Sequence, residues 1–429
     1  MNIKNYCKKY ALFAALFSAT AAFALAQTPK SAAPPRQEKL LNNLKLLMWA
    51  EPAAEKATVK LRIHSGAAFD TLGKEGTMAL LGDVLFPNES VREFFREDLG
   101  GSLAVESNYD YIQINATGNA DQILTILETI SNAVTKPQID KETTAKTRSA
   151  RLERIKELEK NPAYVADLAA AKRLFGNYPY GRSAEGTAES LRKIDFADLL
   201  LAKQRFLTAD NATLAVSGNI KSDYVFKVVR QLFGGWEKSD KRVPATFAQP
   251  DAPEAGMLFV DSPIENAGEF RYAFRSPARN DKDFFAAQIM TKILQNRLQS
   301  KEPNSFARQH ARLLPGWVLV GYKQDGIKRE GNQVALSGAA MGDFVGDLLK
   351  APVESAEFER AKSDLQTDYN QTNTLDTWLD LDTYKIASLK ADRENLQNTT
   401  IADVQKNAER WKKEPLAKIL VLTKQPTEK

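Results

Sequence analysis

The same order of strand-like and helix-like segments occurs twice along the chain, and this repeat constrains the fold more than any single motif. In the first half, residues 57–70 alternate apolar and polar side chains, as a half-buried strand does. A helical stretch, a strand hairpin around Asn108 and an amphipathic helix over 119–134 follow. The second half starts again, with strands at 257–262 and 269–277, a helix at 281–298 and a final strand at 417–424. This repeat indicates an internal duplication.

The mixture of elements predicts an α+β fold with two similar domains, each a mostly antiparallel sheet packed with helices. Residues 237–256 contain three prolines and little periodicity, which is typical of a linker. We therefore place the N-terminal domain at residues 39–236 and the C-terminal domain at residues 257–429. The length of 429 residues also favours two domains over one core.

Residues 1–26 have the features of a cleavable secretory signal peptide. Lys4, Lys8 and Lys9 precede an apolar run that ends in Ala24-Leu25-Ala26, a small-x-small cleavage pattern. The run is short for a membrane span, which needs about 20 residues, so we expect no stable membrane anchor. Residues 27–38 are rich in Pro and Ala and are expected to form a flexible leader. Cleavage removes Cys7, the only cysteine, and a secreted chain without disulfides fits the bacterial periplasm.

The histidine count restricts metal chemistry. The chain has two histidines, His64 and His310, far apart in the sequence. A catalytic zinc ion usually takes three protein ligands, mostly His with a carboxylate, so a zinc site here requires both to converge. We expect structural or surface roles for both and no metal in this chain. The formal charge of +5 includes three signal-peptide lysines and gives no argument for nucleic-acid binding.

Six segments of the sequence match stretches of one known family in the same order, at 76–86, 99–115, 174–220, 232–236, 352–369 and 400–411. By these segments the chain resembles the insulinase/pitrilysin superfamily of zinc peptidases, which includes the mitochondrial processing peptidase. The resemblance covers nearly the whole chain after the signal peptide and is closest to bacterial two-domain members. It implies a fold that forms one half of a peptidase clamshell.

The resemblance also locates the active-site motif of the family and shows that it is degenerate here. Active members carry His-x-x-Glu-His on a helix, in which two His bind zinc and the Glu is the general base. This register aligns with Gly76–Phe86 and puts Ala79, Gly82 and Asp83 at the first His, the Glu and the second His. The register of the third ligand, a Glu on a second helix, falls around Glu153 or Arg154. The resemblance therefore implies no catalytic residue and no metal ligand set in this chain.

Some family members work as pairs in which one subunit lacks zinc. By that resemblance, we expect a non-catalytic subunit that pairs with a zinc-bearing homologous subunit in a periplasmic metallopeptidase that degrades or processes peptides. Extended peptides would add as strands to a sheet edge. Arg308, with Tyr322 or Trp317, is the candidate for the family's substrate-binding Arg/Tyr pair, which stabilises an oxyanion at the partner's zinc.

Two other interpretations are open from the sequence. The chain is a peptide-binding or envelope scaffold protein without hydrolytic activity, for example a homodimer. Alternatively, it is an enzyme with a displaced metal site, which the shortage of histidines disfavours.

Overall fold

The computed structural model describes residues 34–239, 247–248, 250–264, 268–324, 327–330, 333–335 and 344–423. The predicted signal peptide, most of the predicted leader and part of the predicted linker lie outside these residues. The described part of the linker contains no helix or strand. The domain boundaries themselves stay a prediction.

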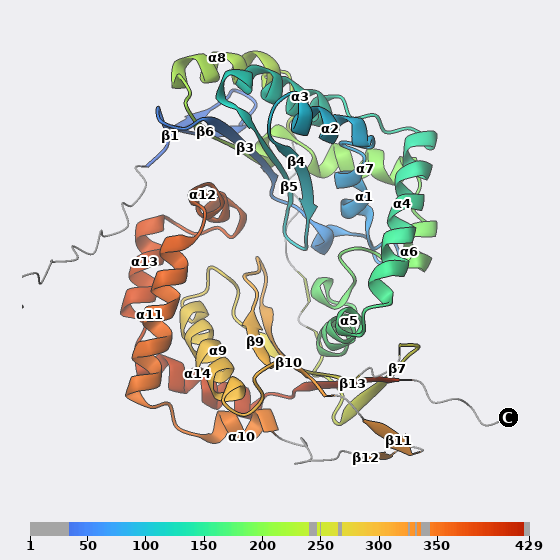
Figure 1. The fold of residues 1–429 in the computed structure, drawn as a ribbon, viewed down its shortest axis with the longest axis vertical. Helices are drawn as coiled ribbons and strands as arrows, with labels where there is room; N and C mark the ends of the chain where they lie inside the picture. The colour runs from blue at the N-terminus through green and yellow to red at the C-terminus, as the bar shows by residue number, and fades with distance from the viewer. Residues whose placement is uncertain are drawn as a thin grey trace, which may run out of the picture. The chain divides into compact units, whose positions relative to one another are not determined.

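Two large sheets form the framework (Figure 1). The first has the order β1-β2-β6-β3-β5-β4, and the second has the order β7-β13-β8-β10-β9. The strands of the first are β1 (Arg36–Lys39), β2 (Lys45–Ala50), β3 (Lys56–Ile63), β4 (Ser102–Ser107), β5 (Ile112–Asn119) and β6 (Ala212–Gly218). Those of the second are β7 (Met257–Ser262), β8 (Gly268–Ser276), β9 (Phe306–Gln309), β10 (Gly316–Lys323) and β13 (Ala417–Thr423). Strands β11 (Lys328–Glu330) and β12 (Gln333–Ala335) pair separately.

The two large sheets repeat one topology, which confirms the predicted fold class. Without β1, each sheet begins with a parallel pair, β2 with β6 and β7 with β13. The remaining neighbours in both sheets are antiparallel. In each half, the last strand of the half thus inserts beside the first strand. The two halves share the strand order that a duplication predicts.

Strand β1 corrects the predicted extent of the leader. The Pro and Ala content predicts that residues 36–38 belong to the flexible leader. In the structure, Arg36–Lys39 pairs with β2 in antiparallel register. The pairing satisfies the outer edge of β2, so ordered structure begins within the expected leader.

Helices surround the sheets. They are α1 (Thr77–Asp83), α2 (Glu89–Glu97), α3 (Ile123–Thr135), α4 (Lys141–Glu159), α5 (Pro162–Phe175), α6 (Ala188–Arg192), α7 (Phe196–Phe206), α8 (Ser222–Phe233), α9 (Phe284–Gln299), α10 (Phe344–Lys350), α11 (Ser355–Gln371), α12 (Thr374–Thr383), α13 (Leu389–Asn398) and α14 (Ile401–Lys413). Short 3-10 turns are η1 (Ala67–Phe69), η2 (Ala120–Gln122), η3 (Pro179–Gly181) and η4 (Ala209–Asn211). No helix among the described residues is long and apolar enough to span a membrane.

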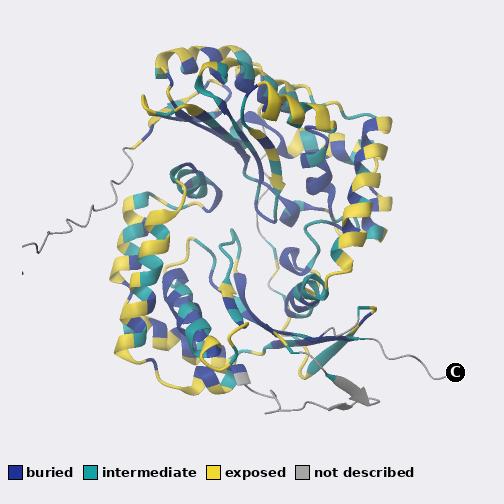
Figure 2. Cartoon of the chain, in the orientation of Figure 1, coloured by how far each residue is buried: buried dark blue, intermediate teal, exposed yellow. Residues whose placement is uncertain are grey.

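Each sheet has its own core, and a further core joins the halves. Apolar residues of β2, β3, β5 and β6 pack with α1, α3 and α8, and those of β8, β10 and β13 pack with α9 and α14. Helix α5 belongs to the first half of the sequence but packs on β8 and β13 of the second sheet. Figure 2 shows both large sheets mostly buried, with many exposed residues on the helices around them. The shared core fixes where α5 and the second sheet meet.

Gly101 is required by a close backbone approach. A Cβ atom at this position would lie 2.0 Å from the carbonyl oxygen of Thr117 on the neighbouring strand. We expect Gly101→Ala to lower the free energy of unfolding by about 1–3 kcal/mol, because the backbone must shift to remove the overlap. Gly235→Ala is the control, since a Cβ there meets no atom within 4 Å. Urea denaturation of both variants measures the difference, and equal stabilities would contradict this explanation.

Candidate functional site

Helix α1 carries the degenerate motif, and a buried carboxylate fixes its start. Asp70 accepts hydrogen bonds from the backbone N–H groups of Gly76 (2.7 Å) and Met78 (2.9 Å). Gly76 has a φ of 92°, a left-handed conformation that suits glycine. Burial raises the pKa of Asp70 to about 7, although the two N–H donors act in the opposite direction. These hydrogen bonds fix the start of α1, which packs into the core of the first sheet.

Two of the three motif positions face a packed interior, and the third, Asp83, is partly exposed. Ala79 and Gly82 are buried on α1. A Cβ atom at Gly82 would lie 3.4 Å from Val105 and 3.5 Å from Ile112, which is ordinary contact. Packing therefore does not require glycine at the position of the general base.

An arginine from α4 occupies the space beside the motif. The Nε and Nη2 atoms of Arg151 donate to the two carboxylate oxygens of Asp83 at 2.7 and 2.9 Å. Its Nη1 atom donates to Glu185 at 2.5 Å, and Nη2 also donates to the carbonyl oxygen of Ala79 at 3.3 Å. Arg151 is 4% exposed. Burial disfavours its charge, but the hydrogen bonds and attraction of Asp83 and Glu185 outweigh this and raise the pKa of Arg151.

These residues do not fit a zinc ion. The position of the first His holds a methyl group, and the carboxylate at the second is engaged by a guanidinium. Among the described residues, no group of three or more His, Cys, Asp or Glu side chains is placed to hold a metal ion. Zinc needs ligands that converge on an open point, whereas here a cation of the protein itself occupies that point.

Neither residue at the expected register of the third ligand contacts Asp83. Glu153 is exposed and pairs with Lys156 at 2.7 Å, as a solvated helix face does. Arg154 is also largely exposed and lies 3.5 Å from Glu185. The residue of α4 that meets Asp83 is Arg151, because the rotation of α4 against α1 turns this side chain inward.

Gly82 offers a direct test of this packing. We expect Gly82→Ala to raise the free energy of unfolding by about 0.5–1 kcal/mol, because alanine restricts the unfolded chain and the space accepts its methyl group. Ala79→Gly in the same helix is the opposite control and should be destabilising. Thermal and urea denaturation measure both, and a loss of stability in Gly82→Ala would contradict the contact geometry.

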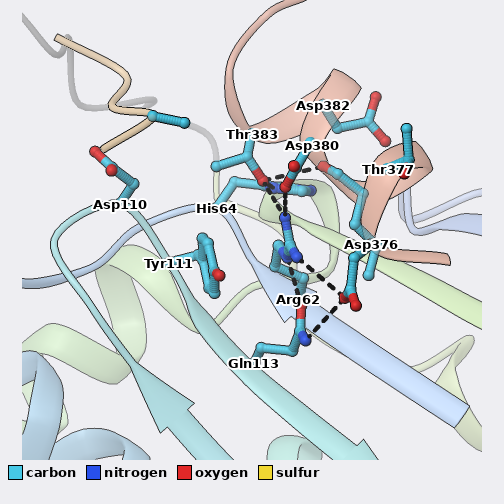
Figure 3. A network of polar contacts seen from close by, with 12 residues as sticks. Arg62, His64, Asp110, Tyr111, Gln113, Asp376, Thr377, Asp380, Asp382 and Thr383 are labelled. Atoms are coloured by element: carbon cyan, nitrogen blue, oxygen red, sulfur yellow. Dashed lines mark hydrogen bonds and ion pairs between the residues drawn. The ribbon is translucent and has the colours of Figure 1, made fainter. Parts of the chain in front are cut away.

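A second polar cluster lies on the face of the first sheet that turns away from its helices (Figure 3). Arg62 of β3 is 1% exposed, and its Nη1 atom donates to Asp380 of α12 at 2.5 Å. Its Nε atom donates to Gln113 at 2.5 Å, and its guanidinium lies 4.0 Å from the centre of the Tyr111 ring. Burial raises the pKa of Asp380, and the charge of Arg62 opposes this rise. The second half of the sequence thus supplies the carboxylate for a cation of the first.

Two further ion pairs extend the cluster along α12. Lys60 pairs with Asp376 at 2.6 Å, and Lys45 pairs with Asp382 at 3.0 Å. The apolar side of α12 also contacts the sheet, where Leu375 and Leu379 pack with residues of β2 and β6. The ring centres of Trp49 and Trp378 are 6.2 Å apart. Both sides of this amphipathic helix therefore hold it on the first sheet.

Sequence reasoning missed this cluster, although a signal was present. The strand predicted over 57–70 places Lys60, Arg62 and His64 on one face. The segment of α12 places Asp376 and Asp380 one helical turn apart. Complementary charges in distant segments indicate a contact only after the topology is known.

His64 has the structural role expected of it. Its two ring nitrogens lie 2.9 Å from the hydroxyl oxygens of Thr383 and Thr213. Burial, with the nearby charges of Lys385, Arg62 and Lys45, lowers the pKa of His64 well below 6.5. Burial likewise lowers the pKa of His310 to about 3, and its ring centre lies 5.8 Å from that of Trp317.

The lowered pKa of His64 predicts that the folded state loses stability at acid pH. The unfolded chain protonates His64 first as the pH falls below 6.5, so the folded state loses stability at about 1.4 kcal/mol per pH unit. We expect the wild type to lose about 2 kcal/mol relative to His64→Gln between pH 7 and pH 5. Urea denaturation of both proteins across this range isolates His64 from the other titrating groups. Parallel stability curves would contradict the neutral state of His64.

The three substrate-binding candidates do not form one site. Arg308 lies on β9, partly exposed, and forms an ion pair with Asp167 of α5. Trp317 is buried in the core between the halves, where it contacts the rings of Tyr109, Phe175 and Tyr180.

Tyr322 is buried and stacks on Phe270, with ring centres 4.6 Å apart. Because side chains alternate along β10, Tyr322 and Trp317 point to opposite faces. Arg308 pairs with Leu319 and shares the face of Trp317. The structure therefore contradicts the pair of Arg308 with Tyr322, and the packing of Trp317 in the core leaves Arg308 alone accessible.

A cavity lies beside β4, the last strand of the first sheet. It has a volume of about 500 Å³ and lies between β3, β4, β5 and α12. Glu106, Tyr111, Asn115, Asp376 and Tyr384 are among its lining residues. The outer edge of β4 pairs with no strand among the described residues. An unpaired strand edge beside a polar cavity can accept an extended segment.

Comparison with known proteins identifies the family. Residues 45–188 match the model of the insulinase family, peptidase family M16, and residues 193–313 match the model of the peptidase M16 inactive domain. The chain belongs to the insulinase/pitrilysin superfamily.

Individual relatives agree with this assignment. The chain is 23% identical over 273 residues to a probable mitochondrial-processing peptidase subunit beta of Arabidopsis thaliana, over 62% of this chain and 51% of the relative. It spans about half the length of the curated relatives it matches.

Solved structures share the fold. A protease from Helicobacter pylori has a TM-score of 0.79 at 15% identity, over 92% of this chain and 100% of that chain. The first half of the periplasmic protease PqqL from Escherichia coli has a TM-score of 0.67 at 14% identity, over 92% of this chain and 93% of that chain. At these identities, the likeness establishes the fold.

Proposed function

We propose that this chain is a non-catalytic insulinase-family subunit that holds peptides for a zinc-bearing homologous subunit in the periplasm. The guanidinium of Arg151 at the motif position carries the proposal, because it takes the place that a zinc ion needs. The zinc and the general base then belong to the partner subunit, and this chain carries no cofactor.

The comparisons support pairing and location. One relative is named as a subunit of a processing peptidase, and one similar structure is the first half of a larger periplasmic protease. The signal-peptide features of residues 1–26 agree with a periplasmic location.

Strand β4 provides the surface for peptide. Ala104 and Glu106 are exposed, and they lie opposite Asn115 and Gln113, which line the cavity. A peptide that adds to β4 as a further strand would place alternate side chains over this cavity. Backbone hydrogen bonds would provide affinity without a strict sequence requirement.

The central experiment measures zinc and hydrolysis for the chain alone and together with a zinc-bearing homologue from the same organism. We expect no chelator-sensitive hydrolysis of an unstructured peptide by the chain alone, and activity in the pair. Stoichiometric zinc with chelator-sensitive cleavage by the chain alone would refute the proposal. Peptide binding without activity in any pair would favour the scaffold interpretation.

A substitution on β4 tests the binding surface. We expect Ala104→Arg to weaken the binding of a fluorescein-labelled unstructured peptide by about tenfold, because the long side chain covers the edge and the cavity. Leu124→Arg on the exposed side of α3 is the control. Fluorescence anisotropy measures both affinities, and equal affinities would place the peptide elsewhere.

A further inference from the structure

Three separate segments meet at the guanidinium of Arg151. Asp83 and the carbonyl group of Ala79 come from α1, Arg151 comes from α4, and Glu185 comes from the segment that precedes α6. The acceptors surround one positive charge whose side chain is 3% exposed. A buried cation is tolerated only where opposite charges and hydrogen bonds compensate for its lost hydration.

The geometry is specific for a guanidinium. Asp83 is bound through two parallel N–H···O hydrogen bonds, and a third nitrogen of the same planar group faces Glu185. A lysine ammonium has the charge but not this fixed fork of donors. Arg154, by contrast, is 60% exposed and lies 3.5 Å from Glu185, as an ordinary surface pair does.

We infer that Arg151 is the resident cation of the degenerate metal site and that it fixes α1 to α4 and to the segment before α6 as a bound metal ion would. The guanidinium and a metal ion exclude each other, because both require the space between positions 79 and 83. The chain therefore needs no zinc to fold. Replacement of Arg151 by a carboxylate, with imidazoles at positions 79 and 83, turns the same place into a zinc site. This inference does not depend on peptide binding.

The melting temperature tests whether Arg151 fixes α1 to α4 and to the segment before α6. We expect Arg151→Met to lower the melting temperature by about 5–10 °C, because it leaves Asp83 without its cation and Glu185 with only the exposed Arg154. Arg151→Lys should restore less than half of this loss, and Asp83→Asn combined with Arg151→Met should cost no more than Arg151→Met alone. Arg154→Met is the matched control and should leave the melting temperature unchanged. Equal effects at Arg151 and Arg154 would overturn the inference.

The metal half is tested by zinc content. The variant Ala79→His/Asp83→His/Arg151→Glu has two imidazoles one turn apart and a carboxylate opposite them. We expect it to bind one zinc ion per chain after dialysis, measured by elemental analysis, and to melt at a higher temperature with zinc. Ala79→His/Asp83→His, which keeps Arg151, should bind none.

Each outcome of the zinc experiment decides the inference. A triple variant that folds only with zinc supports it, since the metal then replaces the guanidinium. A triple variant that folds but takes up no zinc, or one that fails to fold even with zinc, contradicts it. Equal zinc in the variant that keeps Arg151 also contradicts it. Zinc content and melting temperature are independent of peptide binding, so a failure here is distinct from a failure of the proposed function.

Discussion

The burial of the Arg62 guanidinium is the constraint on which the contact between α12 and the first sheet depends. Arg62 lies on a central strand, and a charge there is stable only if carboxylates reach it. The first half provides the amide of Gln113 and the ring of Tyr111, but the carboxylates come from α12. The first sheet therefore completes its charge balance only when α12 lies on it. A contact between distant parts of the sequence follows from one buried cation.

Arg151 is also a buried cation compensated by carboxylates, but it lies in a different part of the structure. Both arginines are almost fully buried, and each is held by two carboxylates. At Arg62 the ion pairs bring α12 onto the polar face of the sheet and leave a cavity beside β4. At Arg151 they fill the interior between α1 and α4. The ion pairs of Arg62 thus border a surface cavity, whereas those of Arg151 lie at the position of the degenerate motif.

Periodicity was sufficient to predict the fold but not the partner of each helix. The alternation in residues 57–70 predicts β3, and the hairpin around Asn108 appears as β4 and β5. Helix α4 is highly charged along its whole length, so no apolar stripe indicates which residue faces α1. The family register points to Glu153 or Arg154, and nothing in the sequence singles out Arg151 as the residue that meets Asp83. Tyr322 and Trp317 are an odd number of positions apart on one strand. The alternation of side chains along a strand therefore predicts that they lie on opposite faces of the sheet.

The two clusters together determine what kind of function the chain can support. A metallopeptidase site needs a metal, a general base and an open path to substrate. Here the metal position holds a cation of the protein itself, and the base position holds Gly82, although its surroundings have room for a side chain. The motif positions thus lack the reactive side chains of such a site, although the space around Gly82 accepts a larger side chain. Among the described residues, the edge of β4 pairs with no further strand and lies beside a cavity, and the proposed binding role rests on this surface.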